Sequence, residues 1–470
     1  MLPYRQDHGI WLPRSVIRSY PRRRVAGAVR RKGRIEVPEA DREALYRKVS
    51  LRLIPFMILL YLVSFLDRVN VGFAALTMNA DLGITPYVFG WGAGIFFFGY
   101  FLFEVPSNVI LEKVGARLWI CRIMVTWGLI SAAMAFVQGI WGYTILRFLL
   151  GAAEAGFLPG MILYLTYWFP AARRARFIAL FMAAVPLASA VGAPVSGIIL
   201  DATHLWFGLK GWQWLFIIEG LPACLLGILV LALLPDGPAK APWLDDAERA
   251  AIAADLARDR AAASHPPLHA LWPALADRRV ILLGLVYFGI VIGLYGIGLW
   301  LPQIVKGMGF TTLETGWIIA LPYLVSAGAM LAWGRHSDRS GERVLHVALP
   351  ALLSAIGFAG SIASSSTTLQ LVFLGVAAIG IYATLGPFWT MPPVFLGGTA
   401  AAGGIALINS IGNLGGFVGP YAVGWIREST GSFTAGMAVL AASLAAAAII
   451  ALVVGRHLRH AAAPSLPGKA

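Results

Sequence analysis

An adjacent acid and base, Asp67 and Arg68, interrupt a run of apolar residues that extends from Leu51 to Leu76. A run of this length and composition is typical of a membrane-spanning helix. Ionised side chains are costly inside a bilayer, so they are rare there and usually functional. A carboxylate in such a place can take up and release a proton, whereas a guanidinium stays charged and offers a planar fork to an anion. The pair therefore predicts a pathway for a charged solute.

Two more charged residues, Arg147 and Glu154, fall on the fourth apolar run. At 1.5 Å per residue, Asp67 lies ~22 Å and Arg147 ~21 Å from the cytoplasmic edge of a ~30 Å core. Glu154 follows Arg147 by two turns on the same helix face. If both helices face one cavity, these residues and Arg68 converge there. The pairs Asp67–Arg147 and Arg68–Glu154 then either lock the helices as structural salt bridges or act as a switch whose proton affinity changes as the cavity opens.

The composition places these residues in a polytopic membrane protein. Of the 470 residues, 59% are hydrophobic and only 13% are charged, about half the charged share of a soluble domain. The apolar runs predict an all-α integral membrane protein with twelve transmembrane helices in two six-helix bundles. The predicted spans are about 51–76, 86–110, 118–138, 141–166, 176–200, 213–234, 280–303, 315–334, 345–364, 369–392, 403–425 and 434–455.

The net charge of +14 is concentrated in alternate connections between the spans. This positive-inside pattern predicts that both termini are cytoplasmic, and it argues against nucleic-acid binding. The basic residues concerned are Lys113, Arg117, Arg173, Arg174, Arg176, Arg335, Arg339, Arg343, Arg456 and Arg459. Cys121 and Cys224 both fall within spans and outside any CxxC or Cys/His cluster, so we expect apolar packing residues and no metal site or cofactor.

The predicted organisation has five parts. Residues 1–45 are a basic, disordered cytoplasmic tail or an extension from a wrongly chosen start codon; 46–234 and 280–456 are the two bundles; 235–279 are a central cytoplasmic loop; and 457–470 are a C-terminal tail. The acidic stretch Asp245–Glu248 predicts the start of a short helix in the loop. The loop carries no catalytic cluster and no nucleotide-binding glycine motif, so we do not expect an enzyme.

An internal repeat supports the division into two halves. The segment Asn108–Arg117, between spans 2 and 3, matches Gly334–Arg343, between spans 8 and 9, in the offsets of an acid, a base, a glycine and an arginine. Paired repeats of this kind are typical of duplicated transporter folds. Charged turns in equivalent places predict conformational gating by Glu112, Arg117, Asp338, Arg339 and Arg343.

The two repeat segments resemble the signature of the major facilitator superfamily. Together with Phe65–Asn70, Phe103–Asn108, Arg147–Gly160, Gly211–Gly220 and Asn409–Pro420, they resemble the anion:cation symporter family, over about residues 45–455. Bacterial members of that family include permeases for tartrate, galactonate, phthalate and hydroxyphenylacetate. The resemblance implies a monomeric symporter of the bacterial inner membrane that imports a small organic carboxylate with protons by alternating access.

The resemblance also assigns roles in the N-terminal half. It implies that Asp67 and Glu154 couple transport to protons and that Arg68 binds the anion, with Arg147 partnering the acids.

In the predicted substrate site, Tyr100, Trp389 and Asn409 match positions that the family uses around the substrate. We add Asn413 as a further candidate, although this side chain also suits a helix-to-helix contact and the aromatic residues also suit the membrane interface.

Two features bear on the substrate. The stretch Met182–Ser189 lacks the Gln that sugar-acid members of the family can carry, which favours tartrate, phthalate or an aromatic acid over galactonate. The alternative is a proton-driven drug or metabolite efflux antiporter of the same superfamily. The segment Ser189–Gly197 holds only a broken version of the antiporter motif, and Arg68 suits an anion better than a cationic drug.

Overall fold

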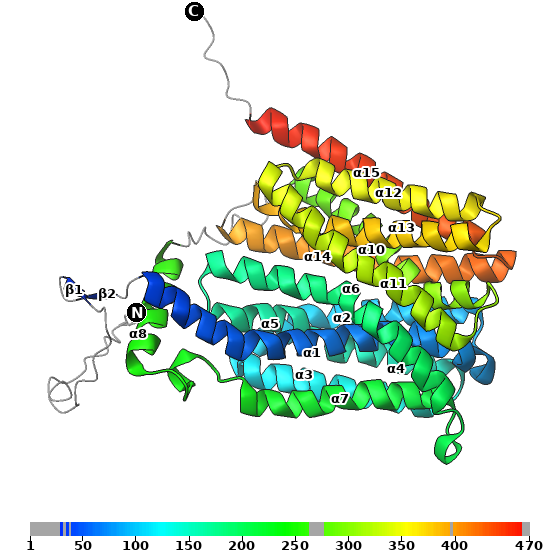
Figure 1. Cartoon of the computed structure of the whole chain (residues 1–470), viewed down its shortest axis with the longest axis horizontal. Helices are drawn as coiled ribbons and strands as arrows, with labels where there is room; N and C mark the ends of the chain where they lie inside the picture. The colour runs from blue at the N-terminus through cyan, green and yellow to red at the C-terminus, as the bar shows by residue number, and fades with distance from the viewer. Residues whose placement is uncertain (1–28, 32–33, 37–38, 263–276, 395–397, 463–470) are drawn as a thin grey trace, which may run out of the picture. The chain divides into compact units, whose positions relative to one another are not determined.

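The computed structural model describes residues 29–31, 34–36, 39–262, 277–394 and 398–462 (Figure 1). Residues 1–48 and 49–470 form separate units. In the first unit, β1 (Val29–Arg31) pairs antiparallel with β2 (Arg34–Glu36), within the stretch that we expected to be irregular. Most of that tail, and all of the C-terminal tail from residue 463, lies outside the described residues.

The second unit is entirely helical where it is described, and α1 enters it from Glu39. The helices are α1 (Glu39–Leu82), α2 (Pro86–Val114), α3 (Ala116–Ala133), α4 (Gly139–Glu154), α5 (Phe157–Thr166), α6 (Ala171–Ala202), α7 (Gly211–Leu233), α8 (Asp246–Ala262), α10 (Arg278–Lys306), α11 (Thr312–Ser340), α12 (Val344–Ala363), α13 (Thr367–Trp389), α14 (Gly398–Thr430) and α15 (Thr434–Ala462), with short 3-10 turns η2 (Met134–Phe136), η3 (Trp206–Gly208), η4 (Pro238–Lys240) and η6 (Pro392–Val394).

Each of the twelve predicted spans corresponds to a helix of this set. Within the described ranges, eleven helical segments are long and apolar enough to cross a membrane, with α4 and α5 counted as one. The remaining span is α14, whose Asn409, Asn413 and many glycines lower its hydropathy. The all-α membrane fold predicted from the sequence is confirmed.

The fourth span is broken directly after Glu154. Gly156 adopts a φ of +87°, a left-handed conformation that residues with a side chain disfavour. At the same break, the Ser107 hydroxyl donates a hydrogen bond to the Ala155 carbonyl (2.6 Å). A Cβ at Gly156 would also lie 2.3 Å from that hydroxyl, so the turn requires glycine. The break ends α4 at Glu154.

Helices pack both within and between the two halves of the sequence. In the first half α3 packs on α7 and α2 on α4; in the second, α10 packs on α14 and α12 on α13 and α15. The halves meet where α6 packs on α11 and α2 on α14 (Figure 1). Glycines make these seams close: a Cβ at Gly90 would lie 2.5 Å from the Pro420 carbonyl oxygen, and one at Gly316 2.6 Å from that of Ala193.

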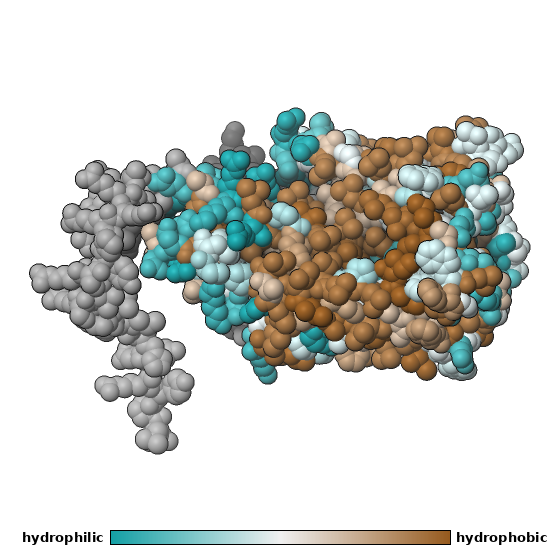
Figure 2. All heavy atoms as spheres, turned by 60° about the horizontal axis from the view of Figure 1, so that its bottom comes forward, coloured by the Kyte–Doolittle hydropathy of each residue, from teal (hydrophilic) through white to brown (hydrophobic). Residues whose placement is uncertain are grey.

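The outer surface of the helices carries large exposed apolar side chains. Leu225 and Ile228 of α7, Leu321 of α11 and Ile449 of α15 are all more than half exposed. Figure 2 shows a broad hydrophobic face over the helices with hydrophilic residues at its two ends. This distribution is that of a protein whose sides face lipid.

The two repeat segments use their last arginine differently. Arg343 bonds Asp338 (2.6 Å) and the Ser337 hydroxyl within its own turn. Arg117 instead reaches the end of α7, where it donates to the Leu231 carbonyl and lies 3.5 Å from Asp236. The side chains of Glu112 and Arg339 are exposed beside these contacts.

The predicted short helix of the central loop is α8. The backbone N–H of Asp245 donates to Glu248 Oε2 (2.9 Å), and the Glu248 N–H donates to Asp245 Oδ1 (2.8 Å). This reciprocal cap satisfies two amide groups at the helix start.

Candidate functional site

Arg68 lies at the centre of a cluster that joins three helices. Its Nη2 forms an ion pair with Glu154 of α4, and its Nη1 donates to the Tyr295 hydroxyl of α10 (2.9 Å). Ser64, one turn before Arg68, donates to the same Glu154 oxygen (3.1 Å). The predicted convergence of Arg68 and Glu154 is therefore present, and Arg68 also connects the two halves of the chain.

Aromatic rings surround the Arg68 guanidinium. Its central carbon lies 5.4 Å from the ring centres of Phe65, Phe96 and Tyr100. Rings at this distance stabilise a cation that has lost water. The Arg68 Nε is buried and has no hydrogen-bond partner among the described residues, so the guanidinium keeps one donor for an additional acceptor.

Asp67 binds neutral donors rather than Arg147. Its carboxylate accepts hydrogen bonds from Trp127 Nε1 and Ser131 Oγ of α3 and from Asn70 Nδ2 (3.0 Å). The predicted Asp67–Arg147 salt bridge is therefore wrong for this conformation. Successive residues of a helix project about 100° apart, so α1 directs Arg68 towards α4 while Asp67 faces α3.

Arg147 is fully buried, with 1% of its surface exposed. Its Nε donates to the Gly92 carbonyl (3.4 Å), whereas Nη1 and Nη2 have no partner among the described residues. Its guanidinium carbon lies 4.9 Å from the Phe96 ring centre. A buried cation without a bonded anion is costly, so the Nη groups of Arg147 have unused capacity to bind a carboxylate.

The second half contributes a smaller group of polar residues. Asn409 of α14 donates to Glu104 of α2 (3.3 Å), and Glu104 is 9% exposed. The Trp389 ring centre lies 4.9 Å from that of Tyr287, and Asn413 is half-buried one turn after Asn409. Glu104 is not among the residues predicted for the site, although an acid inside an apolar span is itself a signal of function.

In the described part of the chain, no group of three His, Cys, Asp or Glu side chains is placed to hold a metal ion. Cys121 and Cys224 are free and buried.

The membrane helices of the described residues form two halves joined across a buried arginine–carboxylate cluster, an arrangement typical of a polytopic membrane transporter. The chain belongs to the Major Facilitator Superfamily, whose family model matches residues 57–420.

Two curated relatives and one solved structure extend this assignment. A protein of Agrobacterium vitis named "Putative tartrate transporter" is 54% identical over 410 residues, which are 87% of this chain and 94% of that protein. A "Quinolone resistance transporter" of Acinetobacter baumannii is 42% identical over 413 residues, 87% of this chain and 94% of that protein. The inward open structure of the xylose transporter XylE from E. coli matches with a TM-score of 0.68 at 14% identity, over 85% of this chain and 95% of that one. The first supports an organic-acid permease group within the superfamily, the second matches over a similar length under a different named substrate, and the third supports the fold.

Proposed function

We propose that this protein imports a small organic carboxylate together with protons across the bacterial inner membrane. The observation that carries the proposal is the Arg68–Glu154 ion pair, which Tyr295 extends into the second half of the chain. The name of the Agrobacterium vitis relative supports tartrate as the first substrate to test.

Glu154 is proposed to act as a carboxylate that competes with the substrate for Arg68. While it is ionised, it neutralises Arg68 and removes the attraction for an incoming anion. A proton on Glu154 cancels its charge and frees the guanidinium for the substrate carboxylate. Binding of the anion and of the proton then support each other, which is what symport requires.

Asp67 and Arg147 are proposed as a second coupled pair. The Nη groups of Arg147 have no bonded anion among the described residues, and Asp67 is held by three neutral donors. A diacid such as tartrate offers one carboxylate to Arg68 and a second to Arg147. In that arrangement Asp67 binds a proton.

The remaining predicted residues are proposed to recognise the body of the substrate. Tyr100 lies against Arg68, and Asn409, Asn413 and Trp389 approach from the second half of the chain. Amide and hydroxyl groups suit the hydroxyls of a sugar acid or tartrate. We propose one functional monomer for each site.

Alternating access is proposed to occur by rocking of residues 46–234 against 280–456, with 235–279 as the linker. Hydrogen bonds from Thr85 Oγ1 (2.6 Å) and the Tyr87 N–H (2.7 Å) to Glu428 join the halves at the end opposite α8. Since the basic connections lie at the α8 end, we propose that both termini are cytoplasmic and that this conformation is closed to the outside.

The repeat turns are proposed to stabilise one state of this motion. The residues concerned are Glu112, Arg117, Asp338, Arg339 and Arg343. Breakage of the contacts of Arg117 or Arg343 would then change the rate of switching rather than the affinity for substrate.

Transport of labelled tartrate in proteoliposomes tests the proposal. Label added outside measures uptake, and label loaded inside measures exchange. Under an inward proton gradient, tartrate should accumulate inside the vesicles. A protonophore should abolish this accumulation. Arg68→Ala should abolish uptake, and Asp67→Asn or Glu154→Gln should reduce accumulation more than exchange. Wild-type accumulation in both acid variants would contradict the proposed coupling.

The second candidate function is proton-driven efflux, which the Acinetobacter baumannii relative's name favours. Export of a quinolone in exchange for protons that move inward, with no tartrate accumulation in the same vesicles, would select this function instead.

A further inference from the structure

Glu219 is a buried acid of α7 to which neither the sequence analysis nor the proposed mechanism gives a role. It is 5% exposed and lies near the middle of a membrane span. The next residue, Gly220, lets α7 approach α3 closely, because a Cβ there would lie 3.0 Å from Ser131 Cβ. Ser131 donates a hydrogen bond to Asp67, so α7 places Glu219 near Asp67 and its hydrogen-bond partners.

The hydrogen bonds around Glu219 are incomplete in a specific way. Ser196 of α6 donates to its Oε1 (2.8 Å), while its Oε2 has no partner among the described residues. Asn70 lies beside this carboxyl group and donates from Nδ2 to Asp67 (3.0 Å), but its own Oδ1 also lacks a partner. A proton on Glu219 Oε2 would turn this unpartnered acceptor into a donor and remove the buried charge of the carboxylate.

The charges that face Glu219 agree with a proton in this place. Asp67 and Asn70 on α1 are a nearby acid and a neutral amide, while α6 presents the Ser196 hydroxyl, and α3 packs against the next residue, Gly220. The ion pairs among the described residues include none with Glu219. A buried carboxyl without a cation is less costly when it is protonated.

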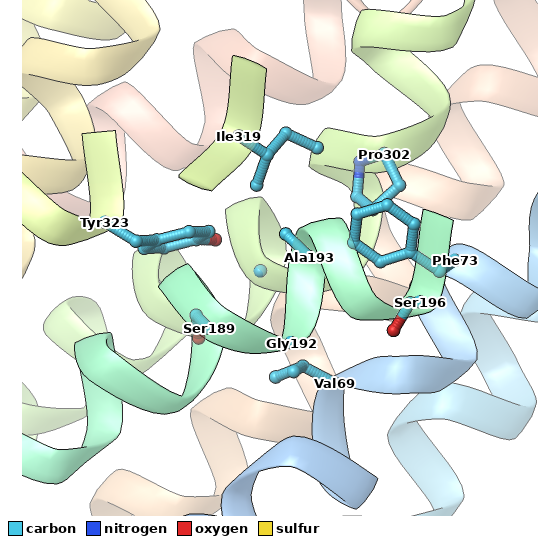
Figure 3. Close-up of a pocket in the computed structure, with 10 residues that line it drawn as sticks. Val69, Phe73, Ser189, Gly192, Ala193, Ser196, Pro302, Ile319 and Tyr323 are labelled. Atoms are coloured by element: carbon cyan, nitrogen blue, oxygen red, sulfur yellow. The ribbon is translucent and has the colours of Figure 1, made fainter. Parts of the chain in front are cut away.

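Ser196 also lines a small cavity between the two halves of the chain (Figure 3). The cavity has a volume of about 10 Å³, close to the space of one water molecule. Val69 and Ser196 border it from the first half, and Tyr323 and Pro302 from the second. The contact between the two halves, here called the seam, must open in alternating access. The cavity in this seam therefore borders the Ser196 hydroxyl that donates to Glu219.

We propose that Glu219 is a third proton-binding carboxyl group, which exchanges protons between this seam and Asp67. In the step, the O–H bond of Glu219 breaks and an O–H bond forms on an Asp67 oxygen, by way of water admitted when the halves part. A hydronium ion from the seam then restores the proton on Glu219. The inference rests on the proposed proton coupling and adds the route by which Asp67 receives its proton.

Glu219→Gln tests the route with little change of shape. The amide oxygen can still accept from Ser196 and the amide group is uncharged, so the variant resembles a permanently protonated acid. In proteoliposomes with a proton gradient, we expect tartrate accumulation to fall on the order of tenfold, while tartrate exchange without a gradient stays at the wild-type rate. Asp201→Asn, which changes an exposed acid on the same helix as Ser196, should leave both rates unchanged.

A second measurement does not need a substrate. Dicyclohexylcarbodiimide modifies protonated buried carboxyl groups, and peptide mass spectrometry locates the adduct in purified wild-type protein. We expect labelling at Glu219 that declines as the pH rises. A Glu219 that stays unlabelled, or is labelled equally at every pH, together with wild-type accumulation in Glu219→Gln, would overturn the inference. If the wild-type protein does not transport tartrate, the proposed substrate is wrong. The labelling then still tests whether Glu219 binds a proton.

Discussion

Replacement of Glu154 by Gln should separate anion binding from proton binding. Glu154 pairs with Arg68 and accepts from Ser64, and Gln preserves both acceptor contacts through its amide oxygen. The variant lacks only the negative charge that opposes the substrate. We therefore expect the purified variant to bind tartrate more tightly than wild-type protein at high pH.

The magnitude follows from the contact that the anion must replace. A hydrogen bond to a charged group contributes about 1.5–3 kcal/mol, so loss of the competitor corresponds to about 10- to 100-fold tighter binding. One linked proton changes the wild-type dissociation constant up to about tenfold for each pH unit. In Glu154→Gln this dependence should be flatter, because the proton-binding group that competes for Arg68 is absent.

Isothermal titration calorimetry in detergent at several pH values measures both effects. Asp201→Asn serves as the control, because it removes an exposed acid outside the site. Weaker binding by Glu154→Gln at every pH, or a wild-type pH dependence in the variant, would refute competition between Glu154 and the substrate.

Two further predictions concern contacts of single side chains. Tyr295→Phe removes the hydroxyl that accepts from Arg68 and should weaken tartrate binding about 10- to 100-fold by calorimetry, whereas Tyr164→Phe, which loses a hydroxyl bond to the Pro235 carbonyl (2.7 Å) outside the site, should bind normally. At the start of α10, hydrogen bonds from Arg279 hold the pKa of Asp277 below its usual value; its stabilising effect is therefore present above about pH 4 and lost as the pH falls through the lower folded value. Asp277→Asn should lower the melting temperature at pH 7 and have no effect at the acid end of the range, and an equal loss at both ends would contradict this linkage.

The charged cluster was partly predictable from the sequence. Depth along the helices and the spacing of Arg147 and Glu154 were enough to place Arg68 near Glu154, since both depend only on regular helix geometry. The partner of Asp67 depended on the rotation of α1. That rotation is set by packing between distant segments, such as Gly72 against Leu299, which no local pattern records.

Two acids were visible in the sequence but were not used. Glu104 and Glu219 each stand alone in an apolar span, which is sufficient reason to suspect function. Their partners, Asn409 and Ser196, come from other helices and could not be assigned from spacing. Trp127 and Ser131 are four residues apart and thus share one face of α3, a pattern that predicts a common ligand only once α1 is known to lie there.

The break in the fourth span after Glu154 could not be predicted from the sequence. Residues 141–166 were predicted as one span, since a glycine within a membrane helix does not require an interruption. The interruption depends on Ser107 of α2, whose hydroxyl bonds the freed carbonyl of Ala155. A contact between residues 48 positions apart therefore decides the local geometry at the site.

The central claim is that a carboxylate and a proton enter together through the Arg68–Glu154 pair. A pH-sensitive dye inside proteoliposomes measures this directly when tartrate is added outside without an imposed gradient. We predict that the lumen acidifies as tartrate enters through the wild-type protein and does not acidify with Glu154→Gln, although that variant still exchanges tartrate. Tartrate entry through the wild-type protein without acidification, or equal acidification with Glu154→Gln, would contradict the claim.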